Sequence, residues 1–321
     1  MTTISDLSVM LFPWGAEPPA VPKIVTAAKL AEDLGYYSVT LPTHMTMPPT
    51  WFFRSFPNRE VLDAMVVLPA IAQATSTIRV GFNSALLPLL PPYAWAKYIA
   101  TLDVMSGGRA IAGLAMGWWE EDFAAVGVER RRRGRMFDEG LEALKCLWTE
   151  ERATFQGQHY RLADVPLEPK PVQKPYPSIW IGGGLKSVER AARYGDYILS
   201  FWPDEEAARQ VWTPNLAAAN RKWGRDAKLA AFTFAYAAEN ESDLERQLPK
   251  LREGVAFEDA TIDPTAVTVS GSPERCAERI RSLRAAGVSH LVLEFQFHGL
   301  DNVDFGMRQM ERFAREVVPL L

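Results

Sequence analysis

The sequence predicts one α/β domain, residues 1–321, folded as a (β/α)8 TIM barrel with insertions. Short apolar runs alternate with amphipathic segments from one end of the chain to the other. Eight such runs are each followed by a helical segment, which is the repeat of an eight-stranded barrel. The length of 321 residues suits one barrel, and no change in composition marks a linker. A doubly wound open sheet is the alternative architecture.

The first half of the chain is expected to supply four strands. The segment 21–34 has apolar residues at helical spacing and ends at Gly35, a favourable C-cap. The segment 91–108 has prolines at its start and glycines past its end, as helices often do. Strands are expected over 7–12, 36–41, 77–83 and 109–115, with helices over 21–34, 60–75 and within 91–108.

The second half continues the alternation. The segment 135–148 is an amphipathic helix, and a β-hairpin is expected around Gly157, followed by a proline-rich extended stretch. Ser272 is placed to cap a helix start. The remaining strands are expected over 178–181, 197–201, 228–238 and 288–297, and the remaining helices over 186–195, 205–223, 242–254, 272–287 and 305–321.

Composition argues against several classes of protein. The net charge of −4 leaves no broad basic face for nucleic acid, and the one basic run, 129–135, fits a solvated turn with one arginine recruited to a phosphate or salt bridge. No segment has the ~18 apolar residues that cross a membrane. Cys146 and Cys276 lie far apart in helical segments, which predicts buried thiols and a cytoplasmic location. No metal-ligand cluster or serine-nucleophile motif is found in the sequence.

The strand ends locate the candidate functional residues, because barrel enzymes carry their sites at the C-terminal ends of the strands. The rule points to His44, Asn83-Ser84, residues 116–121, residues 182–187 and Trp202. The glycines at 182, 183 and 184 precede a helix start, where backbone amides can bind a phosphate and Lys186 and Ser187 can add contacts. A tight turn without any ligand explains the same glycines equally well.

The aromatic and charged side chains that follow the strand expected over 109–115 each allow two interpretations. Trp118 and Trp119 can wall a flat cofactor or substrate, or can belong to a loop that buries its aromatic rings. Glu120 and Glu121 are more typical of carboxylates that stabilise a helix N-terminus than of acid–base groups. His44, taken alone, is more typical of a packing residue than of a catalytic one.

Several stretches, in order across nearly the whole chain, together resemble the bacterial-luciferase-like flavin oxidoreductase family. They are AAKLAEDLGYYSVTLPTH, the run from LPAIAQATST to GWWEEDFAAVGV, RRGRMFDEGLEALKCLW, PKPVQKPYPSIWIGGG and GSPERCAERIRSL. The resemblance implies a luciferase-like TIM barrel that binds reduced FMN or coenzyme F420 at its C-terminal mouth. LPTHMTMPP, ATLDVMSGGR and GWWEEDF look closest to the F420-dependent subgroup.

The resemblance implies roles position by position. It places His44 on a histidine that contacts the flavin face and serves as acid–base or stabilising group, and Asn83-Ser84 at a non-prolyl cis peptide behind the ring. The other positions that it and the strand-end rule assign to the cofactor are Met116, Gly117, Trp118, Gly182, Gly183, Gly184, Lys186, Ser187 and Trp202. The substrate pocket is expected to be lined by Trp51, Phe52, Trp118 and Trp119, the first two in an aromatic loop that can act as a lid.

Three positions depart from the family pattern. Thr43 stands where an acidic residue often precedes the histidine, so any carboxylate partner of His44 comes from elsewhere. Trp118 stands near the position of a glutamate in sugar-phosphate-oxidising relatives, which argues against that substrate. Met116 stands near the position of a phosphate-binding arginine in luciferase, so luciferase-like FMN phosphate binding is not preserved residue for residue.

These observations predict an oxidoreductase that uses coenzyme F420 for hydride transfer to or from a small, apolar organic substrate. A reduced-FMN-dependent two-component monooxygenase that activates O₂, with a flavin reductase as partner, is the alternative. A flavin-binding barrel without turnover is the second alternative. The family resemblance and the abundant aromatic residues also predict a homodimer.

Overall fold

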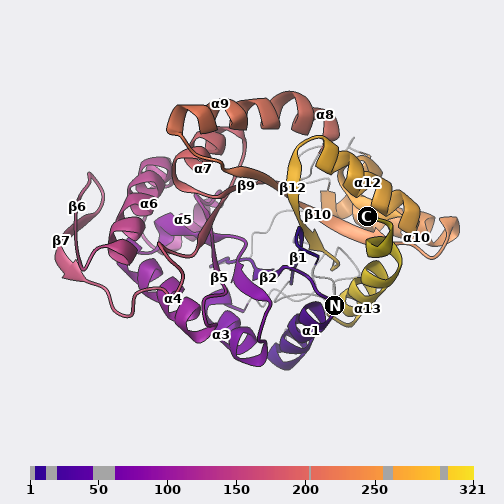
Figure 1. Ribbon diagram of the computed structural model, residues 1–321, viewed down its shortest axis with the longest axis horizontal. Helices are drawn as coiled ribbons and strands as arrows, with labels where there is room; N and C mark the ends of the chain where they lie inside the picture. The colour runs from indigo at the N-terminus through magenta and orange to yellow at the C-terminus, as the bar shows by residue number, and fades with distance from the viewer. Residues whose placement is uncertain (1–3, 12–19, 46–61, 202–203, 256–262, 297–302) are drawn as a thin grey trace.

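The computed structural model describes residues 4–11, 20–45, 62–201, 204–255, 263–296 and 303–321. Eight parallel strands form a closed barrel (Figure 1), which confirms the fold predicted from the alternating pattern. In their order around the barrel the strands are β12 (Val288–Glu294), β1 (Leu7–Met10), β2 (Ser38–Leu41), β3 (Arg79–Phe82), β5 (Ala110–Ala115), β8 (Ser178–Gly182), β9 (Tyr197–Phe201) and β10 (Lys228–Ala237). The pairing of β9 with β10 closes the ring, which rules out the open sheet.

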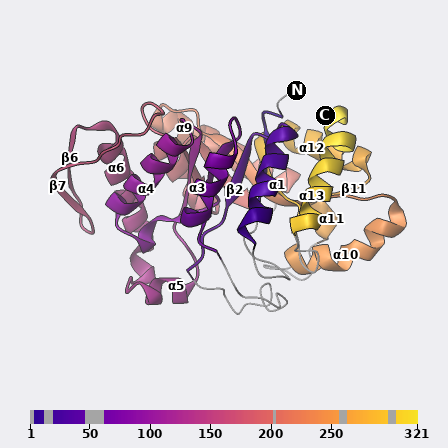
Figure 2. The same ribbon diagram turned by 90° about the horizontal axis from the view of Figure 1, so that it is seen from below.

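Helices surround the barrel on its outside (Figure 1). The longer ones are α1 (Val21–Asp33), α3 (Ala64–Ala74), α4 (Pro92–Met105), α6 (Arg133–Thr149), α9 (Thr213–Trp223), α10 (Glu241–Val255), α12 (Pro273–Ala285) and α13 (Val303–Arg312). Shorter ones are α5 (Glu120–Ala125), α7 (Val188–Tyr194), α8 (Glu205–Ala207) and α11 (Pro264–Val267). In Figure 2, α5 lies below the ends of α3 and α4.

Small additions decorate the barrel. The short strands β4 (Ala85–Leu86) and β11 (Val269–Gly271) extend it beside β5 and β10. The hairpin predicted around Gly157 is formed by β6 (Arg152–Gln156) and β7 (Arg161–Pro166), and it projects beyond α6 and α4 (Figure 2).

Three helices differ in detail from the sequence-based expectation. The one expected over 305–321 ends as α13 at Arg312 and continues as a π-helical turn, Phe313–Val317. The helix expected from residue 60 begins at Ala64, because the Asp63 side chain accepts a hydrogen bond from the backbone N–H of Met65 and caps the helix there. The helix expected over 205–223 is split into α8 and α9 by a π-helical turn, Ala208–Trp212. The Ser272 cap is present, since its side chain accepts from the N–H of Arg275.

Alternate residues of the strands fill the barrel interior. His290 and Val292 of β12 point inward, because Val292 clusters with apolar residues from β1, β5, β8, β9 and β10. At the N-terminal end the His290 ring packs against the rings of Tyr37, Trp180 and Tyr197 at centroid distances of 5.0, 4.9 and 5.9 Å. We call these four residues the barrel floor; they close the end opposite the mouth.

Candidate active site at the barrel mouth

The ends of β2 and β3 are joined at the mouth by a hydrogen bond. Thr43 follows β2, and its Oγ1 donates to the carbonyl oxygen of Ser84 at 2.7 Å. The peptide bond between Asn83 and Ser84 is cis, as the family resemblance implies. The threonine that replaces the expected acidic residue therefore fixes the position of the loop that carries His44.

Asn83 ties the same region to β1. Its side chain is buried, and Nδ2 lies 3.2 Å from the sulfur of Met10, the last residue of β1. The three neighbouring strands β1, β2 and β3 thus end in a connected set of side chains next to His44. The positions predicted after β2 and β3 lie side by side, as the barrel rule requires.

His44 faces a buried carboxylate. Its Nδ1 lies 3.7 Å from Oδ2 of Asp122, with 14% of the His44 side chain and 0% of the Asp122 side chain exposed. This separation is an ion-pair distance, longer than a hydrogen bond. Pairs of this kind often shorten when a ligand binds. Thr43 has no carboxylate to pair with His44. The carboxylate partner of His44 is therefore Asp122, in the first turn of α5.

Asp122 is a candidate site residue that the sequence patterns did not indicate. Its neighbours Glu120 and Glu121 are exposed and occupy the first turn of α5, where acidic residues stabilise a helix, as the sequence predicts. Asp122 and its neighbour Phe123 are fully buried instead. The one available signal is local: Asp122, Phe123 and Val126 form the inward face of this short helix, so a carboxylate there is an exception worth explaining.

The turn before α5 depends on Gly117. Its φ is +78°, and a Cβ added at this position would lie 3.0 Å from the ring of Phe123. Met116, just before it, is partly buried against the main core. The Trp118 and Trp119 rings that follow meet edge to face at 5.5 Å, and 40% of Trp118 is exposed. Both tryptophans thus lie just after the end of β5, and their role as a wall for a cofactor or substrate stays a prediction.

The glycine loop begins where β8 ends, at Gly182. A Cβ on Gly182 would lie 2.8 Å from Ser84 Oγ, and one on Gly183, whose φ is +152°, would lie 2.4 Å from Ser187 Oγ. Gly184 has no atom within 4 Å of a Cβ position, and Lys186 is exposed. The loop then continues through a 3-10 turn (Leu185–Ser187) into α7. An open glycine turn at a helix start fits a phosphate group.

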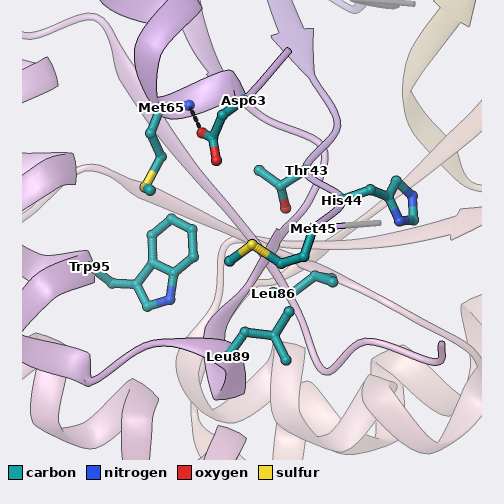
Figure 3. A pocket seen from close by; sticks show the side chains of 8 residues that line it. All are labelled: Thr43, His44, Met45, Asp63, Met65, Leu86, Leu89 and Trp95. Atoms are coloured by element: carbon teal, nitrogen blue, oxygen red, sulfur yellow. Dashed lines mark hydrogen bonds between the residues drawn. The ribbon is translucent and has the colours of Figure 1, made fainter. Parts of the chain in front are cut away.

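A small apolar pocket lies beside the His44 loop (Figure 3). Its lining residues are Thr43, His44, Met45, Asp63, Met65, Leu86, Leu89 and Trp95. The imidazole of His44 points away from the Trp95 side of this pocket (Figure 3). The pocket therefore lies on the α3 and α4 side of His44. The imidazole ring points to the opposite side.

Three predicted site residues, Trp51, Phe52 and Trp202, lie outside the described residues. Among the residues that the structure describes, no group of three or more His, Cys, Asp or Glu side chains could hold a metal ion. Within the same ranges, none of the helices is long and apolar enough to cross a membrane.

Comparison with known proteins identifies the family. A family model described as luciferase-like monooxygenase matches residues 10–290. The chain belongs to the luciferase-like monooxygenase family. The resemblance inferred from the sequence motifs is thereby confirmed, and the chain is a luciferase-like oxidoreductase or monooxygenase.

Luciferase-like relatives with different cofactors are similar to this chain. An FMNH(2)-dependent dimethylsulfone monooxygenase of Pseudomonas putida is 28% identical over 295 residues, covering 81% of this chain and 78% of the relative. The structure of monooxygenase RslO1 from Streptomyces bottropensis has a TM-score of 0.80 at 22% identity, covering 98% of this chain and 99% of that one. An F420-dependent secondary alcohol dehydrogenase, in complex with an F420-acetone adduct, has a TM-score of 0.79 at 20% identity, covering 100% and 99%. Both structural likenesses show the shared fold.

Proposed function

We propose that this protein uses coenzyme F420 to transfer a hydride to or from a small, mainly apolar organic substrate at the barrel mouth. The observation that carries the proposal is the pair formed by His44 and the buried Asp122 carboxylate. A histidine held by a carboxylate at the C-terminal end of a barrel strand suits proton transfer at neutral pH.

The pair divides the work between the two nitrogens of the imidazole. Asp122 faces Nδ1, so it favours the tautomer that carries its proton there and leaves Nε2 as the base. If the substrate is an alcohol that gives up its C–H hydride, Nε2 of His44 would take its O–H proton. In the reverse direction Nε2 returns the proton to the carbonyl oxygen. Asp122 positions the ring and stabilises its positive charge.

The residues at the mouth fit a flavin-type cofactor. A bound deazaflavin supplies the hydride acceptor or donor. Gly183, Gly184 and Ser187 would hold its phosphate, and Asn83-Ser84 and Trp118 would border the ring. The absence of an arginine at Met116 supports F420 over FMN, since the phosphate-binding charge that the resemblance places there in luciferase is missing.

Cofactor titration tests this assignment. We expect F420 to be bound measurably, with quenching of its fluorescence, and FMN to be bound weakly. The reverse order of affinities would refute the deazaflavin assignment while leaving the family and the fold untouched. Turnover is then measured with alcohols, ketones, aldehydes and enones.

A reduced-FMN-dependent monooxygenase is the second candidate, because the Pseudomonas putida relative uses FMNH(2). This function would require a flavin reductase to supply the reduced cofactor. Oxygen consumption that depends on an added reductase and a sulfone or other small substrate would favour it. The same site residues would serve, with His44 as the group that exchanges a proton with the oxygenated substrate.

We also propose that residues 1–321 form one cytoplasmic domain that assembles as a homodimer. The neighbouring helices α3 and α4 expose large apolar side chains, which supports a partner on this face. They are Val66, Tyr93, Tyr98, Val104 and Met105. Light scattering on the eluted protein, which should give twice the chain mass, tests the assembly.

A further inference from the structure

An arginine-rich groove lies beside the mouth, outside the site described so far. We call it the arginine groove; its lining residues are Glu120, Glu129, Arg130, Arg131 and Arg133. They come from the start of α5 and from the turn that leads into α6. Three guanidinium groups against two carboxylates leave the groove positive, although the whole chain carries a net charge of −4.

Part of this positive charge is already neutralised. Arg131 Nε lies 2.6 Å from Glu129 Oε2, and Arg130 Nη1 lies 3.4 Å from Glu120 Oε2. Arg133 has no carboxylate among the described residues within ion-pair distance, and its Nη1 donates to the carbonyl oxygen of Arg130. Burial and the neighbouring charge of Arg130 lower the pKa of Arg133. The positive charges of Arg130 and Arg133 thus lie close together, and the carboxylate of Glu120, 3.4 Å from Arg130, compensates them only in part.

The Nε–H groups of Arg130 and Arg133 have a second feature in common. Both nitrogens are shielded from solvent, and neither donates to an acceptor in the described part of the chain. These shielded donors cannot reach a ligand while the side chains stay in place, so the part available to an anionic ligand is the exposed remainder of each guanidinium, and 38% of the Arg130 side chain is exposed. Paired guanidinium groups with spare donors are the usual arrangement for carboxylate or phosphate recognition.

The groove is connected to the glycine loop by Arg190. Its Nε and Nη2 contact the two carboxylate oxygens of Asp138 at 2.5 and 3.1 Å, and its Nη1 lies 3.5 Å from the carbonyl oxygen of Lys186. A Cβ on Gly134, next to Arg133, would lie 3.4 Å from Arg190 Nη2. Arg190 therefore joins the first turns of α6, which begin next to the groove, to the loop that would hold the cofactor phosphate.

We propose that the arginine groove binds the anionic tail of coenzyme F420, with Arg130 and Arg133 as its carboxylate-binding residues. This rests on the proposed function. FMN ends at its phosphate, whereas F420 continues beyond its phosphodiester into a chain of glutamates. A ligand whose phosphate sits on the glycine loop reaches the groove only if it extends further, so the groove distinguishes the two cofactors by length and charge.

Binding of three cofactors to the full-length protein tests the proposal. The ligands are F420 with its glutamate chain, F420 truncated at the lactyl phosphate, and FMN, each titrated by fluorescence at low and high salt. Arg133→Gln and Arg130→Gln remove groove charges one at a time. Arg132→Gln removes the same charge from a neighbour that contacts Glu129 and does not line the groove. Thermal unfolding of each variant shows whether it remains folded.

We expect Arg133→Gln and Arg130→Gln each to weaken binding of full-length F420 by about tenfold, with a smaller loss at high salt. Binding of truncated F420 and FMN should stay within about twofold of wild type, and Arg132→Gln should change none of the three. An equal loss for truncated F420 would make the groove a phosphate site and overturn the proposal. So would a comparable loss in Arg132→Gln, which would indicate general surface charge.

The wild-type titration separates the two levels of inference. Equal affinity for full-length and truncated F420 overturns the groove proposal alone. Failure to bind either form overturns the proposed cofactor, and the groove proposal with it.

Discussion

His290, in the barrel floor, should make the stability of the protein fall at mildly acidic pH. The side chain is buried on β12, with Nε2 2.7 Å from Ser8 Oγ, and Ser8 in turn accepts a hydrogen bond from Ser38 at 2.7 Å. Burial among aromatic rings lowers the pKa of His290 to about 3. The floor thus holds a neutral imidazole under conditions where an exposed histidine would be charged.

The size and sign of the effect follow from this shift. The unfolded chain binds a proton at His290 below its ordinary pKa of about 6.5, and the folded chain does not until about pH 3. The stabilising contribution is complete above the unfolded pKa and is lost as the pH falls toward the folded pKa. Well below the unfolded pKa the loss is about 1.4 kcal/mol per pH unit, and it amounts to about 2.5 kcal/mol between about pH 7 and pH 4.5.

Urea unfolding of wild type and His290→Gln isolates the histidine. The glutamine keeps a polar partner for Ser8 but does not titrate, and the carboxylates that also protonate near pH 4.5 are common to both proteins. We expect the stability advantage of wild type at about pH 7 to shrink by about 2–3 kcal/mol at about pH 4.5. An advantage that is the same at both pH values would refute the reasoning, because it would mean that His290 titrates alike in both states.

Three further predictions concern the mouth. His44→Ala should leave cofactor affinity within a few-fold and lower turnover by about 10²–10⁴, the range for losing a general acid or base; unchanged turnover would return His44 to a packing role. Asp122→Asn should lower turnover and shift its pH profile, whereas Glu121→Gln, an exposed neighbour, should do neither; equal profiles for the two would argue against a positioning role for Asp122. Gly183→Ala should weaken cofactor binding about tenfold or more, because its Cβ would lie 2.4 Å from Ser187 Oγ, and calorimetric titration would contradict this if the affinity were unchanged.

The barrel could be predicted from the sequence because its strands and helices follow from patterns among neighbouring residues. An apolar run indicates each strand, such as the one expected over 197–201 and found at Tyr197–Phe201. Apolar residues at helical spacing indicate the helices. The errors are also local in origin. The cap at Asp63 competes with a longer helical pattern, and the π-helical turn at Ala208–Trp212 leaves the periodicity of the sequence nearly unchanged.

Candidate site residues could be predicted only where they follow a barrel strand, because barrel enzymes carry their sites at the C-terminal ends of the strands. That rule brings His44, Asn83-Ser84 and the glycine loop to one face of the molecule, and the structure places them there. Asp122 could not be predicted from the sequence. Its contact with His44 depends on the closing of the barrel and on the direction in which α5 leaves the turn at Gly117. Such long-range geometry has no signature in a stretch of neighbouring residues.

The closed barrel floor has a kinetic consequence. Because His290 and its three aromatic neighbours fill the N-terminal end of the barrel, cofactor and substrate would both approach the strand ends from the mouth. When two molecules approach a shared site from one side and the first lies beneath the second, they must bind in sequence, and the deeper one must leave last. Steady-state inhibition patterns for this protein should therefore be those of an ordered mechanism, in which the molecule bound closest to the barrel axis sets the order of release.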